Sequence, residues 1–133
     1  MGFLTILAHS AAAMVMATGG GHAAHTPQSA ALPDTGQITT HMVDAGRGIF
    51  HGQGGCFACH GVDLQGSAVA PPLDKKGKPW KDAKEGTYAA IFGVVTHGVP
   101  GTIMVPHPNG ISDALATEVA AYIWAVNHHG AKP

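Results

Sequence analysis

The sequence is poor in charged residues, aromatic residues and cysteine. Only 11% of its 133 residues are charged and 6% are aromatic. Two cysteines exclude a disulfide framework and a four-cysteine metal site. Seven basic against eight acidic residues give a net charge of −1, which offers no support for nucleic-acid binding. The chain also lacks an internal repeat, a phosphate-binding glycine loop, a nucleophile elbow and a paired-carboxylate motif.

The N-terminal segment also lacks basic residues, since the first Lys or Arg is Arg47. Residues 2–17 are nevertheless mostly apolar, and they are shorter than the roughly 20 residues that a membrane-spanning helix needs. Gly21 and Ala23 suit a signal-peptidase site. We interpret residues 1–24 as a signal peptide, with a retained N-terminal anchor as the alternative. Residues 25–40 carry two prolines and no periodicity, and are interpreted as a linker.

Residues 41–130 are expected to form one all-α domain, because no strand-like alternation occurs and three segments have helical periodicity. The first predicted helix spans 41–50, with Thr40 as its cap and an inner face of Met42, Ala45 and Ile49. The second begins after Thr87 and stops at Gly98. The third begins after Ser112 and stops near Gly130. Their apolar faces are Tyr88, Ile91, Phe92 and Val95 in the second helix, and Leu115, Val119, Tyr122, Ile123 and Val126 in the third.

Three helices joined by long loops offer little apolar surface for a core. With 19 glycines and 9 prolines, the loops at 61–85 and 99–111 are extensive. A domain this small with so few regular elements would be marginally stable alone. A large buried cofactor would supply the missing core.

Residues 56–60, Cys56-Phe57-Ala58-Cys59-His60, form a Cys-x-x-Cys-His motif, which is the pattern for covalent attachment of c-type haem. Two thiols three positions apart can each form a thioether with the same porphyrin, and the imidazole of His60 can then coordinate the iron. A zinc site would need a second pair of ligands. A thioredoxin-like dithiol needs a preceding strand, whereas this motif follows glycines. The motif therefore predicts one covalently bound haem c with its iron.

The second axial ligand is predicted to be Met104. It lies in a proline-bounded loop between two predicted helices, and a soft thioether suits haem iron. A lone methionine more often fills a core. His97 and His107 flank the same loop and are the rival ligands.

With the haem motif, Met104 and the last helix in place, the chain resembles a class I, monohaem c-type cytochrome over about residues 42–128. The segments Gly46-x-x-x-Phe50 and Val119-x-x-Tyr122 look like the family's first and last helices. We expect these helices to cross near Gly46, where the absence of a side chain permits close approach.

The resemblance also implies roles for three residues around the haem. Pro71, in Ala70-Pro71-Pro72-Leu73, matches the proline whose carbonyl accepts a hydrogen bond from the ligand histidine. Trp80 matches a tryptophan that binds a haem propionate, and Tyr88 a tyrosine near the methionine sulfur. For both, a plain core or pocket aromatic is the alternative.

The chain departs from the family pattern at two places. Cys56 lies six positions after Phe50, where the family has four, and Gly54 and Gly55 look like the insertion. The family has proline directly after the ligand methionine, whereas Val105 intervenes here. The second departure bears on the geometry of the loop that carries Met104.

The resemblance implies a one-electron carrier rather than an enzyme, a monomer exported to the periplasm or anchored there by its N-terminus. Its partners would be a donor and an acceptor redox protein, with no nucleic acid. A haem subunit dedicated to a periplasmic dehydrogenase or oxidase is the alternative, and an open-iron haem protein is a third class that Met104 argues against. Lysines near residues 75–84 are expected to be solvated or to steer a partner. Most of the remaining histidines are expected to be solvated, a group made up of His22, His25, His41, His51, His128 and His129.

Overall fold

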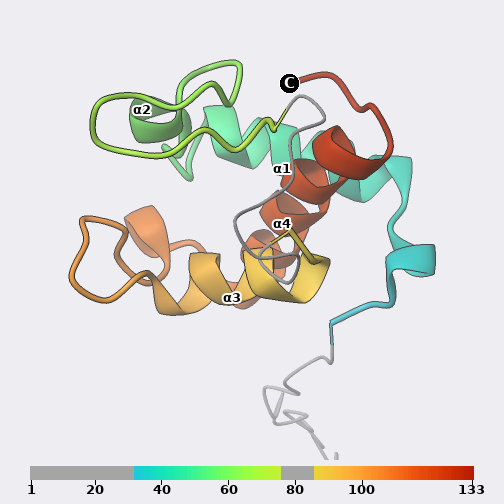
Figure 1. Ribbon diagram of the computed structural model, residues 1–133. Coiled ribbons are helices and arrows are strands. Elements are labelled where there is room, and N and C mark those ends of the chain that lie inside the picture. The colour runs from blue at the N-terminus through green and yellow to red at the C-terminus, as the bar shows by residue number, and fades with distance from the viewer. Residues whose placement is uncertain (1–31, 76–85) are drawn as a thin grey trace, which may run out of the picture. The chain divides into compact units, whose positions relative to one another are not determined.

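The computed structural model describes residues 32–75 and 86–133. The predicted signal peptide and Trp80 lie outside these ranges. Within these two ranges lie four α-helices, α1 (Thr40–His51), α2 (Phe57–His60), α3 (Tyr88–His97) and α4 (Asp113–His128), with 3-10 turns at Thr35–Gln37 and Pro108–Gly110 (Figure 1). Neither described range contains a strand, which confirms the all-α prediction. The short α2 was not expected as a helix, and the first 3-10 turn lies in the predicted linker.

Side-chain caps fix where the three long helices begin. Thr87 accepts a hydrogen bond from the Ala90 amide, and Ser112 accepts one from the Leu115 amide, as predicted. The predicted cap of α1 was wrong by one residue. Thr39, in extended conformation, accepts from the Met42 amide at 3.2 Å, so the helix starts at Thr40. Two adjacent threonines offer the same capping oxygen, and the backbone conformation selects the first.

Helix α1 crosses α4 at Gly46, as the family resemblance implied. A Cβ at this position would clash with the Glu118 carbonyl and lie 2.9 Å from the Tyr122 Cβ. The buried residues of α1 are Gly46, Ile49 and Phe50, and the Phe50 and Tyr122 rings meet edge to face, 5.6 Å between centroids. The buried face of α1 is therefore rotated toward Gly46 relative to the predicted face. Of the predicted residues, Ile49 is buried, whereas Met42 and Ala45 are only half-buried. Close backbone approach decides this orientation.

Helix α4 is the shared element, packing against both α1 and α3 (Figure 1). On α3 the buried side chains include Tyr88, Ile91 and Val95, while Phe92 is partly buried against them. The described residues contain no helix long and apolar enough to cross a membrane. The core outside α1 consists mainly of Leu64, Tyr88, Ile91, Val95, Ile111, Ala116, Val119, Ala120, Ala121, Tyr122 and Ile123.

Two loops extend from this helical scaffold, one following α2 and one joining α3 to α4. The first folds back on itself, because the amides of Leu73 and Asp74 both donate to the Leu64 carbonyl. Asn127 of α4 secures it by donating to the Leu73 carbonyl at 2.9 Å and accepting from the Lys75 amide at 3.0 Å. The second loop, residues 98–110, returns to α3 where the His107 amide donates to the Val95 carbonyl at 2.9 Å. Each loop thus has a defined conformation relative to α4 or α3.

Candidate functional site

The Cys-x-x-Cys-His motif forms a single helical turn. The amides of Cys59 and His60 both donate to the Cys56 carbonyl, at 3.3 and 3.0 Å. Because residues three and four apart share a helix face, this turn presents two thiols and one imidazole on the same side. Both cysteines are free thiols and half-buried. The turn therefore offers the donor set that the motif predicts.

The hydrogen bond of His60 fixes which ring nitrogen is available to a metal. Its Nδ1 lies 2.9 Å from the Pro71 carbonyl oxygen. A carbonyl only accepts, so Nδ1 carries the proton and donates it. In the neutral imidazole Nε2 then holds the free lone pair. Such a bond orients the ring and makes the opposite nitrogen a better donor to a metal.

The surroundings of Cys56 favour the neutral form of its thiol. Burial raises its pKa to about 11, and the nearby Cys59 adds to the increase. Desolvation disfavours a thiolate, which is also the form that binds zinc. The environment of Cys56 therefore suits a neutral thiol or thioether better than a metal thiolate.

Met104 is half-buried at the end of a tight turn in the loop between α3 and α4. Its carbonyl accepts from the Val99 amide at 2.9 Å, and its amide donates to the Thr102 hydroxyl at 3.1 Å. The Thr102 hydroxyl in turn donates to the Val99 carbonyl at 2.8 Å. These three bonds hold the backbone at Met104, which suits a residue that must keep one position.

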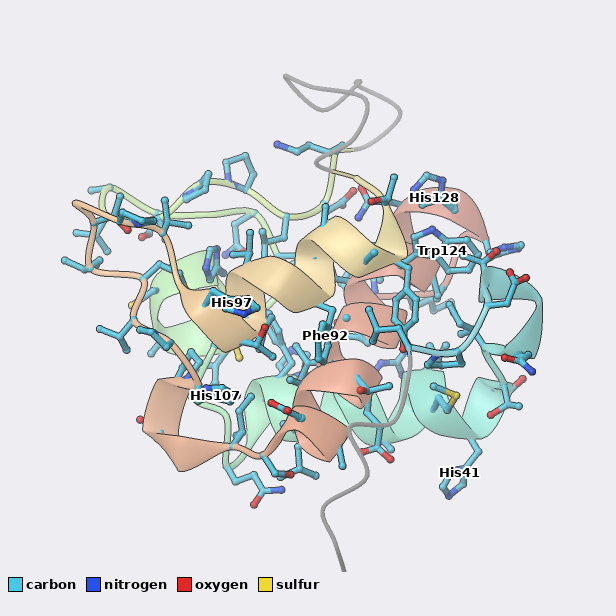
Figure 2. The ribbon with its side chains drawn as sticks, turned by 90° about the horizontal axis from the view of Figure 1, so that it is seen from below. His41, Phe92, His97, His107, Trp124 and His128 are labelled. Atoms are coloured by element: carbon cyan, nitrogen blue, oxygen red, sulfur yellow. The ribbon has the colours of Figure 1, made fainter. Side chains whose placement is uncertain are left out.

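The two rival histidines are His97, the last residue of α3, and His107 in the loop that follows it (Figure 2). His97 Nδ1 donates to the Gly93 carbonyl one turn earlier in α3, at 3.0 Å. His107 Nε2 donates to the Asp113 carboxylate at the start of α4, at 2.7 Å. Nε2 of His97 keeps its lone pair, so His97 is the stronger rival. His107 is thereby the weaker candidate, and the geometry leaves Met104 and His97 as the two candidate ligands.

Tyr88 serves the packing of α3 on α4. Its side chain is buried, and its hydroxyl donates to the Thr117 carbonyl of α4 at 3.2 Å. Burial raises its pKa to about 12. Because the hydroxyl proton is used within the scaffold, the structure favours the core-aromatic interpretation over contact with a methionine sulfur.

Several large apolar side chains near the motif are not covered by protein. Val69 follows the motif and is 62% exposed, while Ile103 and Val105 flank Met104 and are 64% and 56% exposed. The segments that carry them lie on the same side of α4 (Figure 1). Large apolar side chains left exposed in this way are typical of a place where another molecule binds. Apolar surface, two thiols and an imidazole with a free Nε2 together fit a covalently attached haem.

A protein-family model described as cytochrome c matches residues 43–127, more than half of the chain. This chain belongs to the cytochrome c family. The cytochrome is structurally similar to cytochrome cL from Hyphomicrobium denitrificans, with 24% identity and a TM-score of 0.53 over 65% of this chain and 48% of that one. It is also similar to cytochrome cL from the marine methylotrophic bacterium Methylophaga aminisulfidivorans MPT, with 20% identity and a TM-score of 0.55 over 66% and 55%.

These structural likenesses concern the fold, and the cytochrome spans about half the length of either neighbour. No curated protein shows significant sequence similarity to it. The family carries a covalently bound haem c with its iron, and Cys56 and Cys59 have the matching spacing. The haem c prediction is thereby confirmed at the level of the family.

Sequence reasoning missed the role of His51. It was expected to be solvated, but it is half-buried, with Nδ1 3.0 Å from the Arg47 carbonyl and Nε2 2.8 Å from the Val62 carbonyl. Its ring also stacks on Phe57, 6.4 Å between centroids. His51 therefore links the end of α1 to the residues around the motif. The only sequence signal was its position at the end of the first helix.

Proposed function

We propose that this cytochrome is a one-electron carrier whose haem is attached through Cys56 and Cys59 and ligated by His60 and Met104. The observation that carries the proposal is the bond from His60 Nδ1 to the Pro71 carbonyl. It leaves Nε2 as the free donor on the same helical turn that presents both thiols. Bound haem would supply iron that alternates between the ferric and ferrous states.

The chain's own groups would act mainly by holding the two iron ligands in place and by enclosing the haem. Pro71 would keep the His60 ring in one orientation in both oxidation states. Thr102 and Val99 would hold the backbone at Met104, so that the thioether keeps its place. A thioether is a weak donor that favours ferrous iron, so this ligand pair gives a higher reduction potential than two histidines. Apolar side chains such as Ile103 would exclude water and adjust the potential further.

We further propose that the protein acts outside the cytoplasm, since attachment of haem c in this family takes place there. Residues 1–24 would be the export signal or an N-terminal anchor, and residues 41–130 the haem domain. The partners would be a donor and an acceptor redox protein that bind the monomer through small, transient interfaces. No step in this proposal requires a catalytic residue, so we expect a carrier rather than an enzyme.

The proposal is tested on protein expressed together with haem c maturation machinery. Mass spectrometry should show one haem added to the chain, and the reduced protein should give a low-spin c-type spectrum. A redox titration should be reversible and fit one electron. The reduced protein should not bind carbon monoxide at neutral pH. A colourless product with the mass of the polypeptide alone would reject the proposal, and rapid carbon monoxide binding would indicate an open iron.

Met104→Ala identifies the second ligand. The variant should retain the haem, bind carbon monoxide, lose the long-wavelength charge-transfer band of methionine-ligated ferric haem, and have a lower reduction potential. His97→Ala is the matched control, since it removes the stronger rival and should leave spectrum and potential nearly unchanged. If His97→Ala opens the iron while Met104→Ala leaves the spectrum unchanged, the ligand is His97.

A further inference from the structure

The glycine insertion before the motif forms a tight turn that presents two carbonyls outward. The Gly54 amide donates to the Ile49 carbonyl at 2.9 Å, and a Cβ at Gly54 would lie 2.8 Å from that oxygen. Gly55 has a φ of +63°, and a Cβ there would clash with the Asn109 amide nitrogen. The two glycines thus allow the turn to close and allow Asn109 to approach it.

Asn109 reaches this turn from the loop that carries Met104. Its Nδ2 donates to the Gly54 carbonyl at 3.1 Å and to the Gln53 carbonyl at 3.4 Å. Both acceptors are carbonyls, so the amide nitrogen, not the amide oxygen, must face them. Asn109 has φ 55° and ψ 20°, a left-handed conformation that asparagine tolerates better than most residues. A left-handed residue other than glycine persists where surrounding contacts hold it.

These contacts are the connection between two parts of the site. The backbone–backbone hydrogen bonds of the 98–110 loop stay within the loop or go to the end of α3, as from the His107 amide to the Val95 carbonyl. Among the described residues, the two bonds from Asn109 are the only hydrogen bonds between this loop and residues 52–60. Met104 lies in the 98–110 loop, and the two thiols and His60 lie in residues 52–60. Asn109 therefore connects the loop of the predicted second ligand to the haem-attachment turn.

We propose that Asn109 is a positioning residue whose amide, received by the Gly54–Gly55 insertion, holds the Met104 loop against the haem-attachment turn. The proposal rests on the proposed function, because it gives Met104 as the ligand that the loop must keep in place. Loss of the amide should leave the haem attached and the helices packed. It should let the loop open more often, so that the methionine dissociates from the iron more readily.

The test uses three variants of the haem-loaded protein. Asn109→Gly keeps the left-handed backbone but lacks the amide. Asn109→Asp keeps the side-chain shape but presents a carboxylate to two carbonyls. Val43→Ala is the control, because Val43 is a half-buried α1 residue in the half of the helix away from residues 52–55 and its truncation lowers only general stability. Exogenous imidazole is added to the ferric protein, and the loss of methionine ligation is followed by stopped-flow absorption.

We expect Asn109→Gly to bind imidazole about three- to tenfold faster than the parent, which is the range that one or two ordinary hydrogen bonds would give. Asn109→Asp should be faster still at neutral pH, and Val43→Ala should match the parent. Equal rates for Asn109→Gly and the parent would overturn the proposal. So would an increase in Val43→Ala as large as in Asn109→Gly, which would mean that only overall stability matters.

Hydrogen exchange of residues 52–60 and 98–110 separates failure of this inference from failure of the proposed function. If Met104→Ala leaves the parent's spectrum unchanged, the methionine assignment fails. Faster exchange in both segments of Asn109→Gly would then still support the link between them. Unchanged exchange in that variant would reject it, whichever residue ligates the iron.

Discussion

The crossing of α1 and α4 and the two loops around the motif differ in what holds them. At the crossing, Gly46 brings two backbones together, and Phe50 and Tyr122 are completely buried. In the loops, Val69, Ile103 and Val105 are more than half exposed, and single side chains such as Asn109 and Asn127 provide the connections. The scaffold is therefore stabilised by packing, whereas the loops, apart from the buried Leu64, depend more on individual hydrogen bonds.

This difference separates two tasks. Close packing makes the crossing rigid and sensitive to any added volume. In a loop with exposed apolar side chains, the change of one such side chain costs little folding free energy. The burial of these side chains beneath another molecule contributes more. We infer that the helices fix where the motif begins, while the exposed apolar side chains of the loops are available to cover a cofactor.

The largest effect is expected at the crossing. Gly46→Val should destabilise the protein by about 3 kcal/mol or more, since the new side chain would meet the Glu118 backbone, which cannot move without shifting α4. Urea unfolding of the haem-loaded protein measures the change. Gly48→Ala, on the same helix with open space around its Cβ, should instead stabilise the protein by up to about 1 kcal/mol. A Gly46→Val variant as stable as the parent would show that the crossing is not close-packed.

The sequence was informative about the scaffold because its signals there are local. Thr87, Ser112 and Gly98 mark helix ends through bonds to residues a few positions away, and the Gly46–Tyr122 crossing follows from a family pattern. The orientation of α1 was only partly predicted, because its inner face depends on the approach of α4 rather than on the helix's own periodicity.

The loops were less predictable because their contacts are distant in the sequence. Asn109 meets Gly54 across 55 positions, and Asn127 meets Leu73 across 54. No spacing rule marks an asparagine as the partner of a remote carbonyl. His51 was misjudged for a similar reason, since its Nε2 faces the Val62 carbonyl, which lies 11 positions away on the far side of α2. The role of Pro71 was predicted from the family resemblance and not from the residues around it in the sequence.

The two tyrosines give the scaffold a pH dependence of intermediate size. Burial raises the pKa of Tyr88 to about 12, and burial also raises that of Tyr122, with Arg47 partly opposing it. An unfolded chain ionises its tyrosines near pH 10, so between about pH 10 and 12 it has released protons that the folded protein retains. Stability should therefore fall as the pH rises through this window, by roughly 2 kcal/mol for Tyr88.

An ultraviolet titration should show phenolate appearing later in the folded protein than in urea, and Tyr88→Phe should remove part of the alkaline loss of stability. The visible spectrum, recorded in parallel, separates any change of iron ligands from the tyrosine titration. Phenolate appearing near pH 10 in the folded protein would contradict the buried, hydrogen-bonded state of Tyr88.

The smallest effect on the fold is expected in the Met104 loop. Ile103→Ser should change the free energy of unfolding by no more than about 0.5 kcal/mol, because the side chain is 64% exposed. The buried Ile123→Val, which removes a single methylene group, should cost about 0.5–1.5 kcal/mol. If the apolar side chains of this loop shield the cofactor, Ile103→Ser should lower the reduction potential, because a more polar surrounding favours the ferric state. Ile123→Val should leave the reduction potential unchanged. A loss of stability in Ile103→Ser larger than that in Ile123→Val would show that the loop belongs to the core, and the distinction between scaffold and loops would fail.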